Sequence, residues 1–202
     1  MQKNILYITM TLALLGVSQA KNSLGSCPTP ALQQNFDAVK YTGVWFEQIR
    51  DGGMPWEFDD CQQARYTLNE DGTVGVYNTQ FNTKTQQVEG ASAVATFEGA
   101  KGAVKFFSWA PAGDYEVLST DYDQYAVVYS CSSLAVAKFE YIWVLTRERY
   151  PADGVVQSAK DIITSLIPDY DVEANGRVTS QGDSCVYYNG TASSTSFTRF
   201  LY

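Results

Sequence analysis

A ten-residue stretch decides the fold: Tyr41-Thr42-Gly43-Val44-Trp45-Phe46-Glu47-Gln48-Ile49-Arg50. Gly43 lets the backbone bend tightly or approach a neighbour where a Cβ atom would clash. Two residues later, Trp45 opens an extended segment with a side chain large enough to plug one end of a small core. A Gly-x-Trp pair is a weak signal by itself. It becomes informative if several strands follow and if a cationic side chain from late in the sequence contacts the Trp ring.

Short apolar runs, separated by turn signals such as Asp71-Gly72, do follow. They predict eight strands, at residues 43–50, 64–68, 74–81, 88–97, 104–109, 115–119, 122–131 and 139–147. This spacing is typical of a meander, sandwich or barrel. Apolar residues then recur at three- and four-residue steps over 155–167 and stop at Pro168, which predicts one amphipathic helix packed outside the sheet. Residues 172–178 are interpreted as a short ninth strand.

The first twenty residues are typical of a secretory signal peptide. Lys3 precedes an apolar run at 5–17, and Ser18-Gln19-Ala20 supplies the small residues that signal peptidase requires. The run is shorter than a membrane span, which argues against the alternative of a membrane anchor. We therefore expect cleavage after Ala20 and a secreted protein.

Charge and cysteine content narrow the class further. The formal net charge of −8 disfavours nucleic acid and anionic lipid headgroups as partners. The four cysteines, Cys27, Cys61, Cys131 and Cys185, imply two disulfides in a secreted chain, with three possible connectivities. No two cysteines are spaced as Cys-x-x-Cys and the chain has no His, so a zinc site is not expected.

Three blocks resemble the motifs of the lipocalin family. They are Gly43-Val44-Trp45, Thr120-Asp121-Tyr122 and Trp143-Val144-Leu145-Thr146-Arg147. Further segments, including Cys61-Gln62-Gln63-Ala64-Arg65-Tyr66, are most similar to the branch of apolipoprotein D and the insect bilin-binding lipocalins. The resemblance covers about residues 27–185.

This resemblance implies an all-β fold, an eight-stranded antiparallel up-and-down β-barrel with one C-terminal α-helix packed outside. It implies a lipocalin domain at 21–185, followed by a Ser/Thr/aromatic tail at 186–202. It pairs Cys27 with Cys131 and Cys61 with Cys185. It also implies that Arg147 lies across the face of Trp45 at the closed end of the barrel. The residues to which it assigns a structural role at that end are Gly43, Trp45, Thr120, Asp121, Tyr122 and Arg147.

Catalysis is not expected from this sequence. Without His there is no Ser-His or Cys-His nucleophile pair, and no Gly-x-Ser-x-Gly elbow or phosphate loop occurs. Asp169-x-Asp171-x-Glu173 begins like a calcium loop, but Ala174 and Ser180 occupy the positions that need Gly and Glu. We expect neither a metal nor another cofactor.

Ligand binding is the better hypothesis, because a closed eight-stranded barrel can hold one small ligand. The expected ligand-binding residues combine aromatic walls with one or two polar groups: Tyr66, Asn78, Phe106, Tyr141, Trp143 and Trp56. The alternative for these residues is a solid core with no ligand. Glu47 shares the parity of Trp45 and is expected to point inward, where its carboxylate needs a hydrogen-bond donor that the sequence does not identify.

The sequence thus predicts a secreted, monomeric carrier of a small hydrophobic molecule: a fatty acid, sterol, retinoid, carotenoid or bilin. One alternative is a lipocalin that contacts a membrane or a receptor through an apolar loop carrying Met54, Trp56 and Phe58. Another is a lipocalin-type isomerase or oxidoreductase acting on its bound lipid. Asn189 is the acceptor of the single glycosylation sequon.

Overall fold

The computed structural model describes residues 22–190, so the expected signal peptide at 1–20 and residues 191–202 of the predicted tail lie outside the described residues. The elements are β1 (Asn22–Leu24), α1 (Ala38–Tyr41), β2 (Gly43–Asp51), β3 (Gln63–Leu68), β4 (Val74–Asn82), β5 (Gln87–Glu98), β6 (Lys101–Lys105), β7 (Gly113–Thr120), β8 (Tyr125–Leu134), β9 (Ala137–Thr146), α2 (Val155–Leu166), α3 (Val172–Asn175) and β10 (Gly176–Val178).

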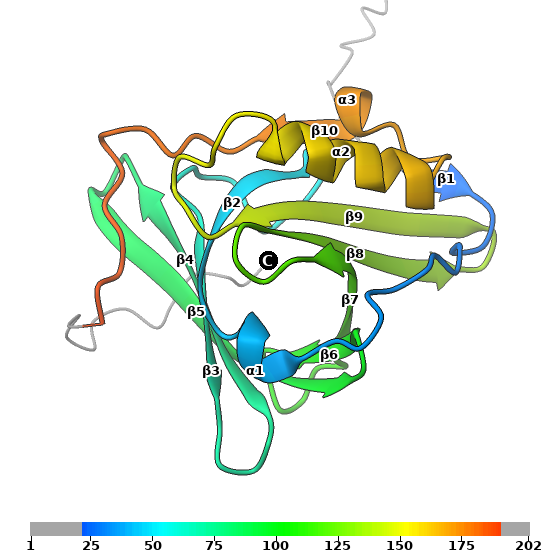
Figure 1. Cartoon of the computed structure of the whole chain (residues 1–202), viewed down its shortest axis with the longest axis horizontal. Coiled ribbons are helices and arrows are strands. Elements are labelled where there is room, and N and C mark those ends of the chain that lie inside the picture. The colour runs from blue at the N-terminus through cyan, green and yellow to red at the C-terminus, as the bar shows by residue number, and fades with distance from the viewer. Residues whose placement is uncertain (1–21, 191–202) are drawn as a thin grey trace, which may run out of the picture.

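Strands β2 to β9 form a closed antiparallel barrel. Each strand pairs with the next along the chain, and β9 also pairs with β2, which closes the ring. Figure 1 looks into this barrel, with β4 and β5 on one side, β8 and β9 on another, and α1 near the rim. The short strands β1 and β10 extend the sheet beside β9 and β2. The all-β fold and the up-and-down order predicted from the sequence are confirmed.

The strand predicted at 104–109 exists, but its bounds are wrong, because β6 occupies 101–105 and Phe106 follows it in a loop. The sequence pattern treats 99–102 as one turn, but Gly99, with a φ of +57°, allows the chain to reverse earlier. Gly102 lies within the strand, where an added Cβ would come within 2.8 Å of the Phe97 ring. Its absent side chain therefore serves close packing and not a turn.

Two other predictions differ in their boundaries or type. Strand β8 begins at Tyr125 and not at residue 122, because the Asp121 side chain accepts backbone N–H groups of 123–125 and Tyr122 has a φ of +69°. The predicted ninth strand at 172–178 is a helical turn, α3, followed by β10. Asp171 caps α3 by accepting two backbone N–H groups. Helix α1 and strand β1 were not predicted.

Two apolar cores lie on opposite faces of the barrel wall. One fills the closed half of the interior around Trp45, Tyr66 and Val128. The other packs Ala159 and Ile163 of α2 against the outer face of β8 and β9. Figure 1 shows α2 lying across these strands, as the helical periodicity predicted. Among residues 22–190, no helix has the length and apolar character needed to cross a membrane.

Two disulfides tie the ends of the domain to the barrel. Cys27 is bonded to Cys131 and Cys61 to Cys185, the pairing that the resemblance implied. Beyond Cys185 the chain continues along the barrel, and the rings of Tyr187 and Phe46 meet at a centroid distance of 5.2 Å. Tyr188 also contacts the barrel through the ring of Tyr77, and the boundary at 185 stays a prediction.

Candidate functional site

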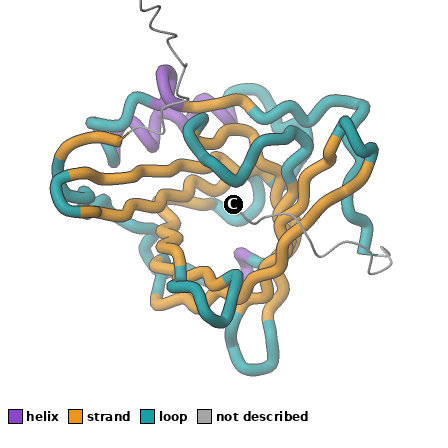
Figure 2. The backbone as a smooth tube through the Cα atoms, turned by 180° about the vertical axis from the view of Figure 1, so that it is seen from behind, coloured by secondary structure: helices purple, strands orange, loops and turns teal. Residues whose placement is uncertain are grey.

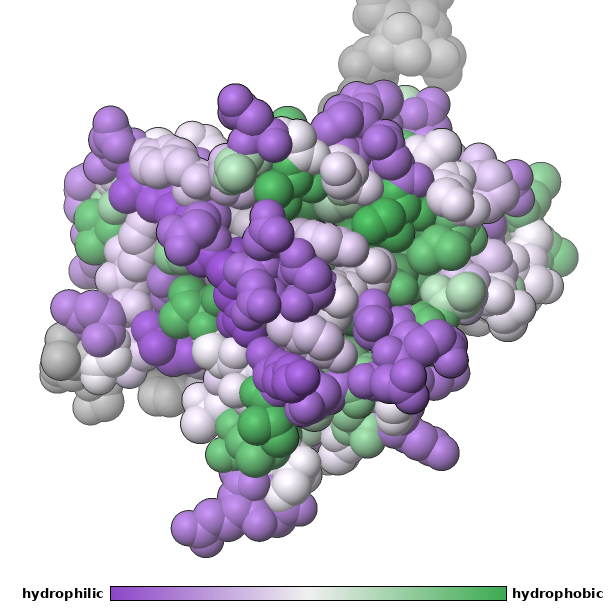
Figure 3. Space-filling view, in the orientation of Figure 1, coloured by the Kyte–Doolittle hydropathy of each residue, from purple (hydrophilic) through white to green (hydrophobic). Residues whose placement is uncertain are grey.

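One end of the barrel is closed by the residues that carry the family motifs. Arg147 lies over the Trp45 ring, with 3.7 Å between the guanidinium carbon and the ring centroid. It also donates hydrogen bonds to the main-chain oxygens of Lys40, Val44 and Tyr122. Gly43, with a φ of +103°, has no Cβ because one would stand 3.0 Å from Arg147 Nη1. Figure 3 shows the same face as Figure 1, with hydrophilic residues across its centre.

The remaining motif residues brace the same end. The Thr120 hydroxyl donates to the main-chain oxygen of Tyr125, and the Tyr122 hydroxyl oxygen accepts a hydrogen bond from the main-chain N–H of Asp37. These contacts hold the turn before β8 against the segment before α1. None of the six motif residues lines the interior cavity.

Above this plug the barrel encloses a cavity of about 580 Å³. Its lower wall carries hydroxyl groups of Tyr66 and Tyr115, which hydrogen-bond to each other at 3.0 Å. Tyr41, beneath them, bonds to Tyr115 at 2.9 Å. Burial raises the pKa of Tyr66 to about 12 and that of Tyr115 well above its ordinary value, so these hydroxyls stay protonated. They form a neutral polar group at the inner end of an apolar space.

All six residues expected to bind ligand line this cavity: Trp56, Tyr66, Asn78, Phe106, Tyr141 and Trp143. Tyr66, Asn78, Tyr141 and Trp143 lie on strands, as the alternation predicted, whereas Phe106 reaches the cavity from the β6–β7 loop. Trp56 packs edge-on against Tyr141, with 5.0 Å between the ring centroids. Tyr115 also lines the cavity, and the alternation of β7 was the signal that could have identified it.

The large apolar side chains of the loop between β2 and β3 differ in how far they are exposed. Met54 is buried, with 4% of its surface exposed, while Phe58 is 67% exposed. Trp56 lies between these extremes at the cavity wall. The three side chains therefore do not form one outward-facing surface. Figure 2, taken from the side opposite to Figure 1, shows the loops that gather at this end of the barrel.

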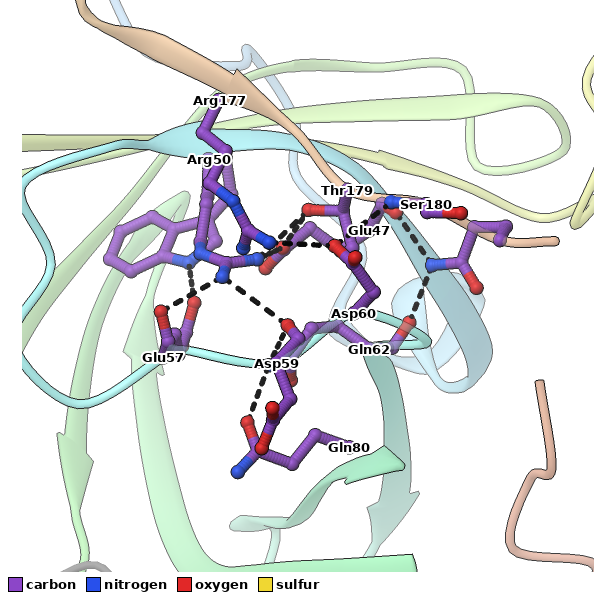
Figure 4. A network of polar contacts seen from close by, with 12 residues as sticks. Glu47, Arg50, Glu57, Asp59, Asp60, Gln62, Gln80, Arg177, Thr179 and Ser180 are labelled. Atoms are coloured by element: carbon purple, nitrogen blue, oxygen red, sulfur yellow. Dashed lines mark hydrogen bonds and ion pairs between the residues drawn. The ribbon is translucent and has the colours of Figure 1, made fainter. Parts of the chain in front are cut away.

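A buried polar network anchors this loop to the barrel. Arg50 Nη1 donates to Glu47 Oε1 at 2.7 Å and to Thr179 Oγ1 at 3.0 Å. Its Nη2 donates to the main-chain oxygens of Glu57, at 2.8 Å, and of Asp59, at 3.3 Å. Figure 4 shows Arg50 between Glu57 on one side and Glu47 with Thr179 on the other. Arg50 and Thr179, which also hydrogen-bonds to Glu47, are the donors that the sequence did not identify.

A β-bulge explains why this partner was missed. The register between β2 and β9 shifts between Glu47 and Ile49, so Ile49 turns outward into the core beneath α2. Regular alternation would have placed Glu47 and Ile49 on one face and Arg50 on the other. The extra residue reverses the parity and brings Arg50 to the side of Glu47.

Glu57 enters the cavity from the loop and accepts a hydrogen bond from Trp143 Nε1, at 3.2 Å from Oε2. Burial, and next the charge of Glu47, raise the pKa of Glu57 to about 8, against the smaller opposing effects of Trp143 and Arg50. At neutral pH the carboxyl group of Glu57 is therefore protonated. No sequence pattern marks this residue, because its position depends on the fold of a loop.

A closed eight-stranded barrel with an external helix, a Trp–Arg plug and an internal cavity defines the class of single-domain barrel proteins that surround a small ligand. The family model described as a lipocalin-like domain matches residues 36–175. The chain belongs to the lipocalin family.

Relatives place the chain more finely. Apolipoprotein D of Oryctolagus cuniculus is 39% identical over 166 residues, which cover 80% of this chain and 87% of that protein. The Lazarillo protein of Schistocerca americana is 29% identical over 173 residues, covering 82% and 80% of the two chains. The structure of insecticyanin from the tobacco hornworm Manduca sexta superposes with a TM-score of 0.70 at 18% identity, covering 83% of this chain and 93% of that one. The resemblance to the apolipoprotein D branch is confirmed.

Proposed function

We propose that this protein is a secreted carrier that binds one small apolar molecule inside its barrel and releases it unchanged. The observation that supports this function is the cavity of about 580 Å³, whose walls are mostly aromatic and aliphatic with a few polar groups. Such a composition suits an apolar ligand with one or two oxygen atoms. The relationship to apolipoprotein D adds support, because that protein is named for lipid carriage.

The test fills the cavity and asks whether ligand uptake is lost. Ala91 on β5 lines the cavity, whereas Val94 on the same strand is exposed on the outer face. Retinol binding is followed by quenching of tryptophan fluorescence in the wild type, Ala91→Phe and Val94→Phe. We expect Ala91→Phe to weaken binding at least tenfold and Val94→Phe to leave it unchanged. Equal losses in both variants, or no uptake of retinol and related lipids by the wild type, would contradict carriage.

Carriage also requires that the ligand be returned unchanged. Extraction of the protein from its native source, followed by mass spectrometry, is expected to yield an apolar compound in near-equimolar amount. Incubation of the purified protein with that compound should give no new product. Conversion of the ligand would support a lipocalin-type isomerase or oxidoreductase instead.

Secretion is supported by the leader-like residues 1–20 and by the two disulfides, which persist in oxidising compartments. Expression of the full chain in eukaryotic cells should give protein in the medium that begins at Lys21. Asn189 is exposed, so we expect a glycan there that Asn189→Gln removes. We expect a monomer in sedimentation experiments.

Contact with a membrane or receptor is a second candidate, favoured by the exposed rings of the β6–β7 loop. Phe107 and Trp109 stack with 5.4 Å between centroids, and Trp109 is 77% exposed. Phe58 is exposed on another loop of the barrel. Vesicle flotation should then require Trp109 and Phe58, while Trp109→Ser leaves retinol uptake intact. Absence of flotation with both neutral and anionic vesicles would remove the membrane form of this candidate.

A further inference from the structure

The ionisable residues that line the cavity are all acidic or phenolic. Glu47, Glu57 and Asp114 contribute carboxyl groups, and no Lys or Arg of the described residues lines the cavity. The sequence contains no His. A ligand carboxylate that entered this cavity would lose its water and meet no cation in the wall, which carries a large energetic penalty.

The nearest guanidinium group cannot take that role. Arg50 is buried and directs its hydrogen bonds to Glu47, to Thr179 and to two main-chain oxygens of the β2–β3 loop. Its charge is balanced by Glu47, with which it forms a buried ion pair. Binding a carboxylate at Arg50 would require this pair to separate and the loop to lose its anchor.

Glu57 and Glu47 together form the polar surface of this wall. The Trp143 indole N–H reaches Glu57 Oε2, while Arg50 and Thr179 both reach Glu47 Oε1. Arg50 therefore pairs with Glu47, and the carboxyl group of Glu57 has no ion-pair partner among the described residues. With Glu57 protonated, the charges of Glu47 and Arg50 cancel and this part of the wall is neutral. Ionisation of Glu57 would leave one uncompensated negative charge in the cavity.

Two amide oxygens in the same cavity provide an independent observation. Gln63 Oε1 and Asn78 Oδ1 are buried and have no hydrogen-bond partner in the structure, although both residues line the cavity. Gln63 is only 6% exposed. Buried acceptors of this kind are normally satisfied, and here a hydrogen-bond donor on a ligand would satisfy them. An alcohol has such a donor, whereas a carboxylate has none.

We infer that Glu57 and Glu47 are specificity-determining residues, which together with the acceptors Gln63 and Asn78 make the cavity select uncharged apolar alcohols over carboxylates of the same skeleton. This inference rests on the proposed carrier function and narrows its ligand class. It favours sterols, retinol and hydroxylated carotenoids over fatty acid anions and bilins. The selectivity follows from the charge and the hydrogen-bond acceptors of the wall and not from its shape.

The charge of the wall also links binding to pH. Glu57 faces Glu47 and Arg50 from β2, Tyr66 from β3 and Trp143 beside Tyr141 from β9. Burial keeps the pKa of both tyrosines above the ordinary value, so neither ionises before Glu57. Rising pH through about 8 therefore ionises Glu57 first, and an uncharged ligand that covers it should bind more weakly.

The experiment compares three retinoids with one apolar skeleton: retinol, retinoic acid and retinylamine. Dissociation constants are measured by tryptophan quenching from pH 6.5 to 9.5. At pH 7 we expect retinol to bind at least tenfold more tightly than retinoic acid. Above about pH 8 the dissociation constant of retinol should rise, by up to tenfold per pH unit. Tighter binding of retinylamine than of retinol would overturn the inference in favour of a cationic ligand.

Two variants distinguish the effect of Glu57 ionisation on retinol affinity from the effects of other groups on the same loop. Glu57→Gln keeps the shape and cannot ionise, so its retinol affinity should lose the fall above pH 8. Asp59→Asn is the matched control on the same loop, because the Asp59 side chain does not line the cavity, and it should retain the fall. Equal affinity for retinol and retinoic acid, or a pH profile unchanged in Glu57→Gln, would overturn the inference while leaving carriage intact. Failure of all three retinoids to bind would overturn both.

Discussion

The barrel wall buries carboxyl groups on both of its faces but balances them differently. On the outer face beneath α2, Glu140 accepts a hydrogen bond from Tyr129 at 2.8 Å and pairs with Lys138 at 2.9 Å. On the inner face, Arg50 pairs with the carboxylate of Glu47 and donates to the main-chain oxygen of Glu57, whose carboxyl group has no ion-pair partner among the described residues. Glu140 on the outer face thus has a counter-charge of its own, whereas the inner face holds two carboxyl groups beside the single charge of Arg50.

This difference separates two uses of buried charge. A matched ion pair beneath a helix can be sealed by packing, and its contribution is to stability and specificity. A surplus acid in the wall of a cavity instead adopts the neutral form and can change its charge near physiological pH. The comparison predicts that substitutions on the outer face alter stability at all pH values, while those on the inner face act through protonation.

The largest effect is expected for Glu140→Gln, which leaves the Lys138 ammonium buried without its counter-charge. The two side chains are only 1% and 9% exposed. We expect a loss of about 3–5 kcal/mol in the free energy of unfolding, measured by urea denaturation with intact disulfides. Glu116→Gln is the control, because its partner Lys101 is largely exposed, and it should cost less than about 1 kcal/mol. Similar losses in both variants would remove the contrast.

An effect that develops only over part of the pH range is expected for Glu57→Gln. The folded protein keeps a proton on Glu57 up to about pH 8, whereas the unfolded chain loses it near the ordinary pKa of 4.5. The folded state thus binds more protons, and wild-type stability falls as pH rises between these values and levels off above 8.

Glu57→Gln lacks this loss, so its stability relative to the wild type should increase by up to about 1.4 kcal/mol per pH unit from pH 5 to 8. Urea midpoints of both proteins at five pH values measure the difference. A difference that stays constant across this range would show that Glu57 titrates normally.

The smallest effect is expected for Trp143→Phe. The indole N–H of Trp143 stabilises the ionised form of Glu57, so its removal should raise the pKa of Glu57 further. The stability of Trp143→Phe should also fall with rising pH, but the pH above which it levels off should lie about half to one unit higher than in the wild type. Trp109→Phe, on the exposed loop, should leave this pH unchanged. A downward shift in Trp143→Phe would contradict the assigned hydrogen bond.

The architecture could be predicted from the sequence because the patterns that determine it are local. Alternating runs and Gly-containing turns marked the strands, and the periodicity at 155–167 marked the helix. The boundaries failed where the same residue type serves two purposes, as with Gly102, which permits close packing within a strand. Helix α1 was missed because its four residues are too short for a periodic signal.

The residues on the inner face of the barrel could be predicted from the sequence only in part. Strand parity placed Tyr66, Asn78 and Trp143 at the cavity, but parity fails across the bulge after Glu47, so Arg50 was not recognised. Glu57 depends on contacts between Arg50 and the main chain of a loop, which no side-chain pattern encodes. The polar half of the candidate site therefore required the three-dimensional structure.

The two disulfides have a topological consequence. The bridges join Cys27 to Cys131 and Cys61 to Cys185, so the segments they close overlap along the chain. Every peptide bond between Cys27 and Cys185 lies inside at least one of these segments. A single proteolytic cut anywhere in that region leaves both fragments covalently joined, and the nicked protein migrates as one species until a reducing agent is added.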